Sequence, residues 1–292
     1  MSLTNRDTKT CAFKAVRVMS RVPLEHFLPG TPRLHYLEWN PAGAPTIVLL
    51  HGGSANGWWW QAVADQIGPR PRLLALDQRG HGDSDWVAPP AYAPADYVAD
   101  LHRLVGALAL RAPIIVGHSQ GGINALAYAG THRDVARAVV AIDSPLRSSP
   151  QRDRFLKRLR SLPTVVYADL ATAQARFRLM PDEGQVAGAI LAEIATRSVR
   201  PVSGGYTLKF DRESFWGRDG IDVLKVVAMI EVPVLLVRAE HSRLMSAQAL
   251  NEAVASNPLV RTQVIPAAYH HVLLEQPAAV AELIRGLISE FA

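Results

Sequence analysis

One serine of this chain lies between glycines in a pattern that suits a nucleophile. Ser119 stands in the string Gly117-His118-Ser119-Gln120-Gly121-Gly122, after the apolar run 113–116 and before the helix-like stretch 123–129. Glycines two residues to either side remove the Cβ atoms that would clash in a sharp strand-to-helix turn, and such a turn presents the hydroxyl to a base. A serine before a helix can also be only an N-cap, so the rest of the chain has to decide between the two roles.

Apolar runs and helix-like stretches alternate along most of the chain. The runs are of strand length and almost continuously apolar, which is typical of parallel strands buried on both faces. Their alternation with helix-like stretches predicts an α/β domain with a mostly parallel sheet between two layers of helices. The strands are predicted at 34–39, 46–50, 72–76, 113–116, 138–142, 232–237 and 261–265, and the helices at about 58–67, 94–110, 246–256 and 278–291.

The alternation breaks between residues 145 and 219. This segment is basic and helix-like, its joints contain proline and glycine, and no run in it resembles another buried strand. The length of 292 residues favours one large domain with an insertion over two independent domains. We therefore predict a core domain formed by residues 1–144 and 220–292, and a helical cap formed by residues 145–219.

Polar and glycine-rich residues follow the strands, at the edge where open parallel sheets bind ligands. Four of these segments resemble motifs of the α/β-hydrolase family, in the same order along the chain. They are the oxyanion-like loop His51-Gly52-Gly53, the segment 77–84, the serine turn 117–121 and the histidine segment 270–277. The resemblance spans roughly residues 30–290. It implies an α/β-hydrolase fold with a mostly parallel central sheet, helices on both faces and a helical cap inserted after the sixth strand.

In this family a serine attacks an acyl carbon after a histidine has taken its proton. The resemblance implies that Ser119 is the nucleophile and that His270, five residues before Glu275, is the general base. His271 is the competing base, because adjacent side chains point in different directions and only one of them can face the serine. The implied chemistry needs no cofactor and no metal.

The orienting acid is where the chain departs from the family pattern. The usual position follows the strand after the cap and aligns with Ser242, whose hydroxyl cannot stabilise an imidazolium as a carboxylate does. Some family members supply the acid from the end of the preceding strand, which in this chain is Asp143. We predict that Asp143 is the acid and that Glu240 is the second candidate. The alternative is that Asp143 only caps the start of the cap segment.

Other residues near the strand ends are assigned to binding the substrate. The resemblance implies an oxyanion hole formed by the backbone N–H groups of Gly53 and Gln120. Ser54, Trp59 and His118 are predicted to line the site, although most tryptophan clusters of this kind are core packing. Apolar cap side chains that could form an acyl or alcohol pocket are Phe155, Tyr167, Phe177, Met180, Phe210, Phe215 and Trp216.

Charged and polar residues outside this constellation are predicted to be structural or solvent-exposed. The net charge is +5, and its main basic cluster lies at 147–160, where Phe155, Leu156 and Leu159 recur at helical spacing. The basic cluster is therefore predicted to form the solvent-exposed face of an amphipathic helix. Nucleic-acid binding is disfavoured because no stacking aromatics are interleaved with the basic residues. Four further residues match structural loop positions of the family: His51, Asp77, Arg79 and His81.

Cysteine content and hydropathy limit the class of protein. Cys11 is the only cysteine, which excludes an intrachain disulfide and a cysteine-rich zinc site. The first twenty-odd residues contain no apolar segment of signal-peptide length, and no stretch approaches the length of a membrane span. We expect a cytoplasmic protein without membrane or nucleic-acid partners.

These features together predict an enzyme that hydrolyses a small-molecule carboxylic ester. The same constellation also serves lactones, thioesters and carbon–carbon bonds next to a ketone, so these substrates are the alternatives within the fold. A dehalogenase or epoxide hydrolase is disfavoured, because those family members have an aspartate at the position of Ser119. A non-catalytic ligand-binding protein on the same scaffold is the alternative of a different class.

Overall fold

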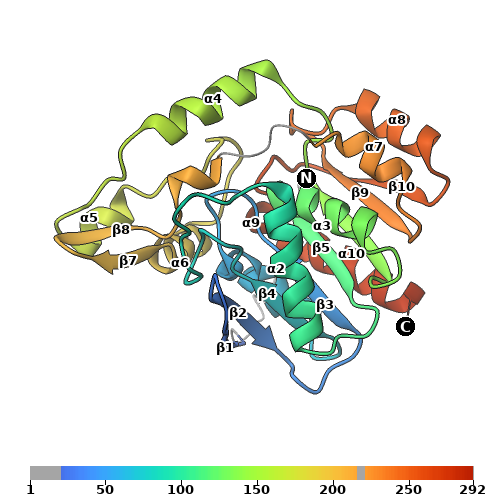
Figure 1. Cartoon of the computed structure of the whole chain (residues 1–292), viewed down its shortest axis with the longest axis horizontal. Coiled ribbons are helices and arrows are strands. Elements are labelled where there is room, and N and C mark those ends of the chain that lie inside the picture. The colour runs from blue at the N-terminus through green and yellow to red at the C-terminus, as the bar shows by residue number, and fades with distance from the viewer. Residues whose placement is uncertain (1–20, 216–220, 292) are drawn as a thin grey trace, which may run out of the picture.

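The central element of the fold is an eight-stranded sheet (Figure 1). The computed structural model describes residues 21–215 and 221–291. The strands are β1 (Leu24–Leu28), β2 (Leu34–Trp39), β3 (Thr46–Leu50), β4 (Arg72–Leu76), β5 (Ile114–His118), β6 (Ala138–Ile142), β9 (Val234–Ala239) and β10 (Val260–Ile265). Their order is β1-β2-β4-β3-β5-β6-β9-β10. Only β2 runs antiparallel to its neighbours within this sheet, so the predicted mostly parallel sheet is confirmed.

The edge strand β1 is not among the strands predicted from the sequence, the first of which begins at Leu34. β1 pairs only with β2, with Leu24 opposite Glu38 and Leu28 opposite Leu34. Most of its side chains are exposed or half-buried, and only Leu28 is buried. A strand at the edge of a sheet that buries little apolar surface has no strong apolar pattern, so its sequence resembles a loop.

Helices cover both faces of the sheet, as predicted. Side chains of β3 alternate between two cores, because successive residues of a strand point to opposite faces. Ile47 and Leu49 pack with the helices of one face, and Val48 and Leu50 pack with those of the other. The first face carries the 3-10 helix η1 (Gly57–Trp60), α1 (Gln61–Ile67), α9 (Val272–Glu275) and α10 (Pro277–Phe291). The second carries α2 (Pro94–Ala107), α3 (Gln120–Thr131), α7 (Val223–Ala228) and α8 (Ala247–Ser256).

The segment between β6 and α7 contains strands as well as helices. Its elements are α4 (Pro150–Ser161), α5 (Leu170–Ala175), α6 (Gly188–Arg197), β7 (Val199–Val202), β8 (Gly205–Leu208) and η2 (Arg212–Phe215). The expectation of a cap without strands is wrong, because β7 and β8 form an antiparallel hairpin. Its strands are short and half-exposed, which removes the apolar run used to recognise a buried strand. Gly204, with φ of +86°, supplies the turn.

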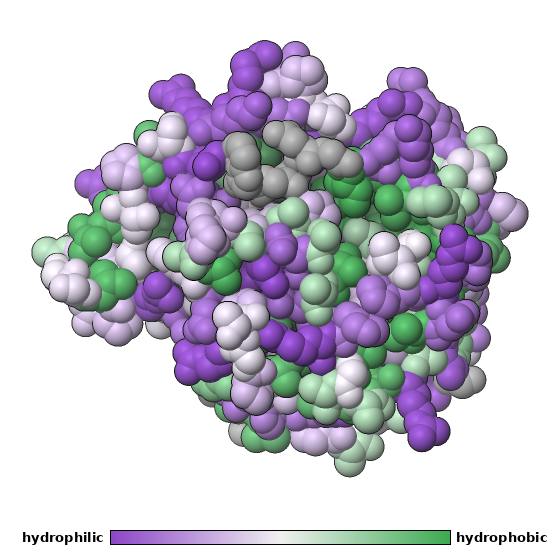
Figure 2. Space-filling view, viewed as in Figure 1, coloured by the Kyte–Doolittle hydropathy of each residue, from purple (hydrophilic) through white to green (hydrophobic). Residues whose placement is uncertain are grey.

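Helix α4 is the basic amphipathic helix expected from the sequence. Figure 1 shows it at the top of the view, away from the sheet, and Figure 2 shows hydrophilic residues gathered over it. Arg154, Lys157 and Arg158 are exposed, whereas Leu156 and Leu159 are half-buried. None of the helices in the described ranges is both long enough and apolar enough to cross a membrane. Cys11 lies outside the described residues.

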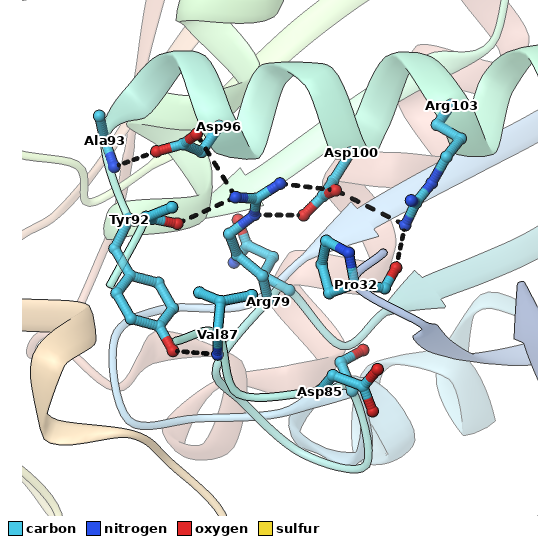
Figure 3. Close-up of polar contacts among 12 residues, drawn as sticks. Pro32, Arg79, Asp85, Val87, Tyr92, Ala93, Asp96, Asp100 and Arg103 are labelled. Atoms are coloured by element: carbon cyan, nitrogen blue, oxygen red, sulfur yellow. Dashed lines mark hydrogen bonds and ion pairs between the residues drawn. The ribbon is translucent and has the colours of Figure 1, made fainter. Parts of the chain in front are cut away.

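Arg79 illustrates how the loop after β4 is held. Its guanidinium donates from Nε and Nη2 to the two carboxylate oxygens of Asp100 on α2, at 2.6 and 2.9 Å (Figure 3). Nη1 donates to the carbonyl oxygen of Ala91 at 2.9 Å, and Asp96 lies 3.4 Å away. A bidentate pair of this kind fixes orientation as well as distance. The contacts support the scaffold role predicted for Arg79.

Candidate active site

Ser119 lies in a strained turn between β5 and α3. Its φ and ψ are +54° and −115°, and its side chain makes no capping hydrogen bond to α3. A Cβ on Gly117 would lie 2.2 Å from the carbonyl oxygen of Gly121. Non-glycine residues adopt such backbone angles only where the surroundings enforce them, and this occurs mainly at functional sites. The structure therefore does not support the alternative in which Ser119 acts only as an N-cap.

Gly121 offers a test of how tightly this turn is packed. A Cβ there would lie 2.4 Å from the carbonyl oxygen of Leu50. We expect Gly121→Ala to lower the free energy of unfolding by about 3 kcal/mol, the upper range for overpacking, because rigid backbone must move. Gly286→Ala is the matched control: Gly286 lies within α10 with no atom near its missing Cβ. Urea denaturation should show this control more stable by about 0.5–1 kcal/mol. Equal stabilities of the two variants would contradict the close packing.

His270 and Asp143 form a buried pair. Nδ1 of His270 and Oδ2 of Asp143 are 2.7 Å apart, and both side chains are almost fully buried. Asp143 follows β6 directly, with φ of +43°. Burial raises the pKa of Asp143, and the hydrogen bond from Ser242 counteracts this rise. Such a contact holds the imidazole in one tautomer, with its second nitrogen directed away from the carboxylate.

Ser242 contacts the same carboxylate. Its Oγ donates to Oδ2 of Asp143 at 2.5 Å, and the backbone N–H of Ala239 donates to Oδ1 at 3.3 Å. Ser242 follows β9, which lies next to β6 in the sheet. The residue at the family's usual acid position is therefore a hydrogen-bond donor to the carboxylate from the neighbouring strand. The contact joins residues 99 positions apart in the chain, so no local sequence pattern predicts it.

The two competing candidates lie elsewhere. The side chain of Glu240 is half exposed and accepts a hydrogen bond from the backbone N–H of Ala267 at 2.8 Å. His271 donates from Nε2 to the carbonyl oxygen of Pro181 at 2.8 Å. Burial lowers the pKa of His271, so this imidazole is neutral at pH 7. The contact between acid and histidine thus joins Asp143 to His270 rather than either competitor.

His118 and Glu183 hold the backbone of His270. Nε2 of His118 donates to the carbonyl oxygen of His270 at 2.7 Å. Burial lowers the pKa of His118 well below its ordinary value, so the ring is neutral. Oε1 of Glu183, a residue between α5 and α6, accepts from the backbone N–H of His270 at 3.2 Å. Sequence reasoning missed Glu183, and no local pattern distinguishes it from other acidic loop residues.

Ser119 and His270 line one cavity of about 190 Å³, whose wall also includes residues of the segment between β6 and α7. Of the predicted substrate-site residues, Gly53, Ser54, Trp59 and His118 line it. Gln120 does not line it but lines a neighbouring small cavity. From the predicted cap residues, Phe155, Met180 and Phe215 line the cavity, whereas Tyr167, Phe177 and Phe210 do not contribute to the lining, and Trp216 lies outside the described residues.

Among the described residues, a second cavity and a cluster of possible metal ligands are alternative candidate sites, and neither contains a serine–histidine pair. A larger hollow of about 680 Å³ lies between β10 and α10 and has no serine or histidine in its wall. His35, Asp77 and Asp83 have possible metal-ligand atoms within 4.8 Å of one another. However, Asp77 accepts hydrogen bonds from His35 and from the backbone of Asp83, and Lys209 pairs with Asp83. This cluster therefore has the contacts of a structural hydrogen-bond network.

The fold is that of an α/β hydrolase, and comparisons with known proteins agree with it. A model of the alpha/beta hydrolase family matches residues 47–283, and the chain belongs to this family. It is 30% identical over 252 residues to 2-(acetamidomethylene)succinate hydrolase of Mesorhizobium japonicum, covering 84% of this chain and 88% of the relative. It is 25% identical over 259 residues to an esterase of Mycobacterium tuberculosis, covering 86% and 85%. The solved structure of E-2-(acetamidomethylene)succinate hydrolase has a TM-score of 0.78 at 26% identity, covering 91% of this chain and 99% of that one.

Proposed function

We propose that the protein is a serine hydrolase that cleaves a carboxylic ester. Ser119 is the nucleophile, His270 the general base and Asp143 the acid that orients the histidine. The observation that carries this proposal is the 2.7 Å contact between buried Asp143 and His270, at a cavity whose wall also contains Ser119. Family membership and the esterase among the relatives support the choice of an acyl substrate.

The reaction proceeds in two steps. Nε2 of His270 takes the hydroxyl proton while Oγ of Ser119 bonds to the carbonyl carbon. The ester C–O bond then breaks, the alcohol leaves with the proton from His270, and an acyl-enzyme remains. In the second step His270 takes a proton from water, whose oxygen attacks the acyl carbon. The acid is released, and the proton returns to Oγ of Ser119.

Two backbone donors complete the proposed machinery. The N–H groups of Gly53 and Gln120 stabilise the negative oxygen of the tetrahedral intermediate. Gly53 lies in the cavity wall, and Gln120 is the first residue of α3, directly after Ser119. Because glycine has no Cβ, a substrate oxygen can approach the backbone of Gly53 closely.

The purified protein should hydrolyse short-chain p-nitrophenyl esters. We expect release of p-nitrophenol at rates proportional to enzyme, and a faster first turnover if deacylation limits the rate. A parallel screen of a lactone, a thioester and a β-diketone separates the ester from the other acyl bonds that the same residues serve. If the protein cleaves one of these three compounds but no ester, the substrate bond is the one cleaved, and the proposed ester hydrolysis is wrong. Inertness toward all of them would favour a ligand-binding protein on the hydrolase scaffold.

A further inference from the structure

Among the described residues that line the active-site cavity, Arg152 on α4 is the one with a permanent charge, and it also lines the small cavity next to Gln120. Among the described residues that line this cavity there is no lysine, aspartate or glutamate. His118, His270 and His271 also line it, and burial lowers the pKa of His118 and of His271, so these two are neutral at pH 7. Most of the remaining wall is apolar. A bound ligand therefore meets the permanent positive charge of Arg152 in largely apolar surroundings, where electrostatic interactions are stronger than in water.

Arg152 is largely buried and poorly paired. Its side chain is 18% exposed, and Nε has no hydrogen-bond partner within the described ranges. The one ion pair found for it there joins Nη2 to Oδ1 of the adjacent Asp153 across 3.9 Å, which is long for a hydrogen bond. Burial lowers the pKa of Arg152, as expected when water is removed without a close anion. Burying a charge without a partner costs free energy, and a bound anion would offset that cost.

Two other arginines of the protein have close carboxylate partners and serve as a comparison for Arg152. Arg160 on the same helix donates from Nε to a carboxylate oxygen of Glu213 at 2.8 Å. Arg79 forms the bidentate pair with Asp100 described above. Arg152, with 18% of its side chain exposed, is more buried than Arg160 with 32%, yet it has no close carboxylate partner among the described residues, and it lines the cavity that contains Ser119.

We propose that Arg152 binds a carboxylate of the substrate. The inference rests on the proposed ester hydrolysis and names its substrate class: an ester whose acyl group ends in a carboxylate. The planar guanidinium matches a carboxylate in a bidentate arrangement. Trp59 also lines the cavity, and its indole N–H is buried without an acceptor among the described residues, so it offers a second donor to the ligand. Phe155, Leu156 and Leu159 from the turns after Arg152 suit a short methylene chain between the two carbonyl carbons.

The first test compares matched charged and neutral esters. Mono-p-nitrophenyl esters of succinate, glutarate and adipate are assayed beside p-nitrophenyl esters of neutral acids of the same chain length. We expect the wild type to have the higher kcat/KM for at least one charged ester. Arg152→Met should lower the ratio of charged to neutral kcat/KM by about 10- to 100-fold, the loss expected for a charge-assisted hydrogen bond. For Arg152→Lys, the ratio of charged to neutral kcat/KM should lie between those of the wild type and of Arg152→Met, because lysine keeps the charge but not the planar donors.

Arg154→Met is the matched control, since Arg154 lies on the exposed side of the same helix and does not line the cavity. It should leave the ratio unchanged. Thermal unfolding of Arg152→Met checks that the variant folds. A ratio that Arg152→Met does not change, or that Arg154→Met lowers equally, would overturn the role of Arg152.

A binding measurement separates this inference from the proposed reaction. Calorimetric titration of the wild type with glutarate should give a Kd about 10- to 100-fold lower than for Arg152→Met, and glutaramide should bind both proteins weakly. Glutarate binding that depends on Arg152, in a protein that cleaves no ester, would support the carboxylate site and contradict the reaction. Hydrolysis of neutral esters, with neither a charged-ester preference nor glutarate binding, would support the reaction and refute the carboxylate site.

Discussion

The Ser119→Ala variant is expected to lose ester hydrolysis by about 10⁵-fold or more, the scale found when a serine nucleophile is removed. The missing Oγ leaves no atom that can form the acyl-enzyme. The fold should persist, because the Ser119 side chain makes no cap for α3 and alanine meets the same backbone strain as serine. The measurements are steady-state hydrolysis of a p-nitrophenyl ester and thermal unfolding of both proteins.

Two controls define the outcome for Ser119. Ser289→Ala removes a hydroxyl on the exposed side of α10 and should leave the rate unchanged. Mass spectrometry after treatment with a sulfonyl fluoride should show one adduct on the wild type, on the peptide that contains Ser119, and none on Ser119→Ala. A variant that keeps more than a tenth of the wild-type rate would refute the mechanism.

Asp143→Asn is expected to lower kcat by about 10³- to 10⁴-fold, with far less effect on KM. An amide in place of the carboxylate can hold the wrong tautomer of His270 and does not stabilise the imidazolium. Glu240→Gln is the matched control, because its half-exposed carboxylate contacts the backbone of Ala267 instead. Its kcat should change by less than about threefold. The opposite ranking of the two variants would assign the acid to Glu240.

An exchange of two residues tests the same assignment more sharply. Ser242 and His270 both contact Oδ2 of Asp143, at 2.5 and 2.7 Å, so a carboxylate at position 242 can approach the same imidazole nitrogen. We expect the double variant Asp143→Ser/Ser242→Asp to recover at least tenfold in kcat over Asp143→Ser alone. Absence of any recovery, in a double variant with wild-type thermal unfolding, would show that only the end of β6 can supply the acid.

The sequence predicts well those elements whose conformation is determined by residues within the same short segment. The serine turn depends on Gly117 and Gly121, which lie within the motif itself. The parallel strands depend on apolar runs, and each run was found within a few residues of its observed bounds. The strand β1 and the hairpin of β7 and β8 were missed because they bury little apolar surface.

The features that sequence leaves open depend on contacts between distant parts of the chain. Asp143 and His270 are 127 residues apart, and the choice between Asp143 and Glu240 is a matter of which strand end faces the histidine. From the sequence, Arg152 is predicted to be one of several basic residues on the solvent-exposed face of an amphipathic helix. Only the packing of α4 over the cavity distinguishes it from exposed Arg154 on the same helix.

The adjacency of β6 and β9 has a consequence for how relatives are recognised. A survey that checks for an acid only in the alignment column after β9 finds Ser242 and would class this chain among degenerate homologues that have lost activity. A survey that checks for a carboxylate oxygen within hydrogen-bonding distance of the histidine finds Asp143 from the adjacent strand. Chains with a serine in that column and an aspartate after β6 therefore belong among candidate enzymes rather than among inactive paralogues.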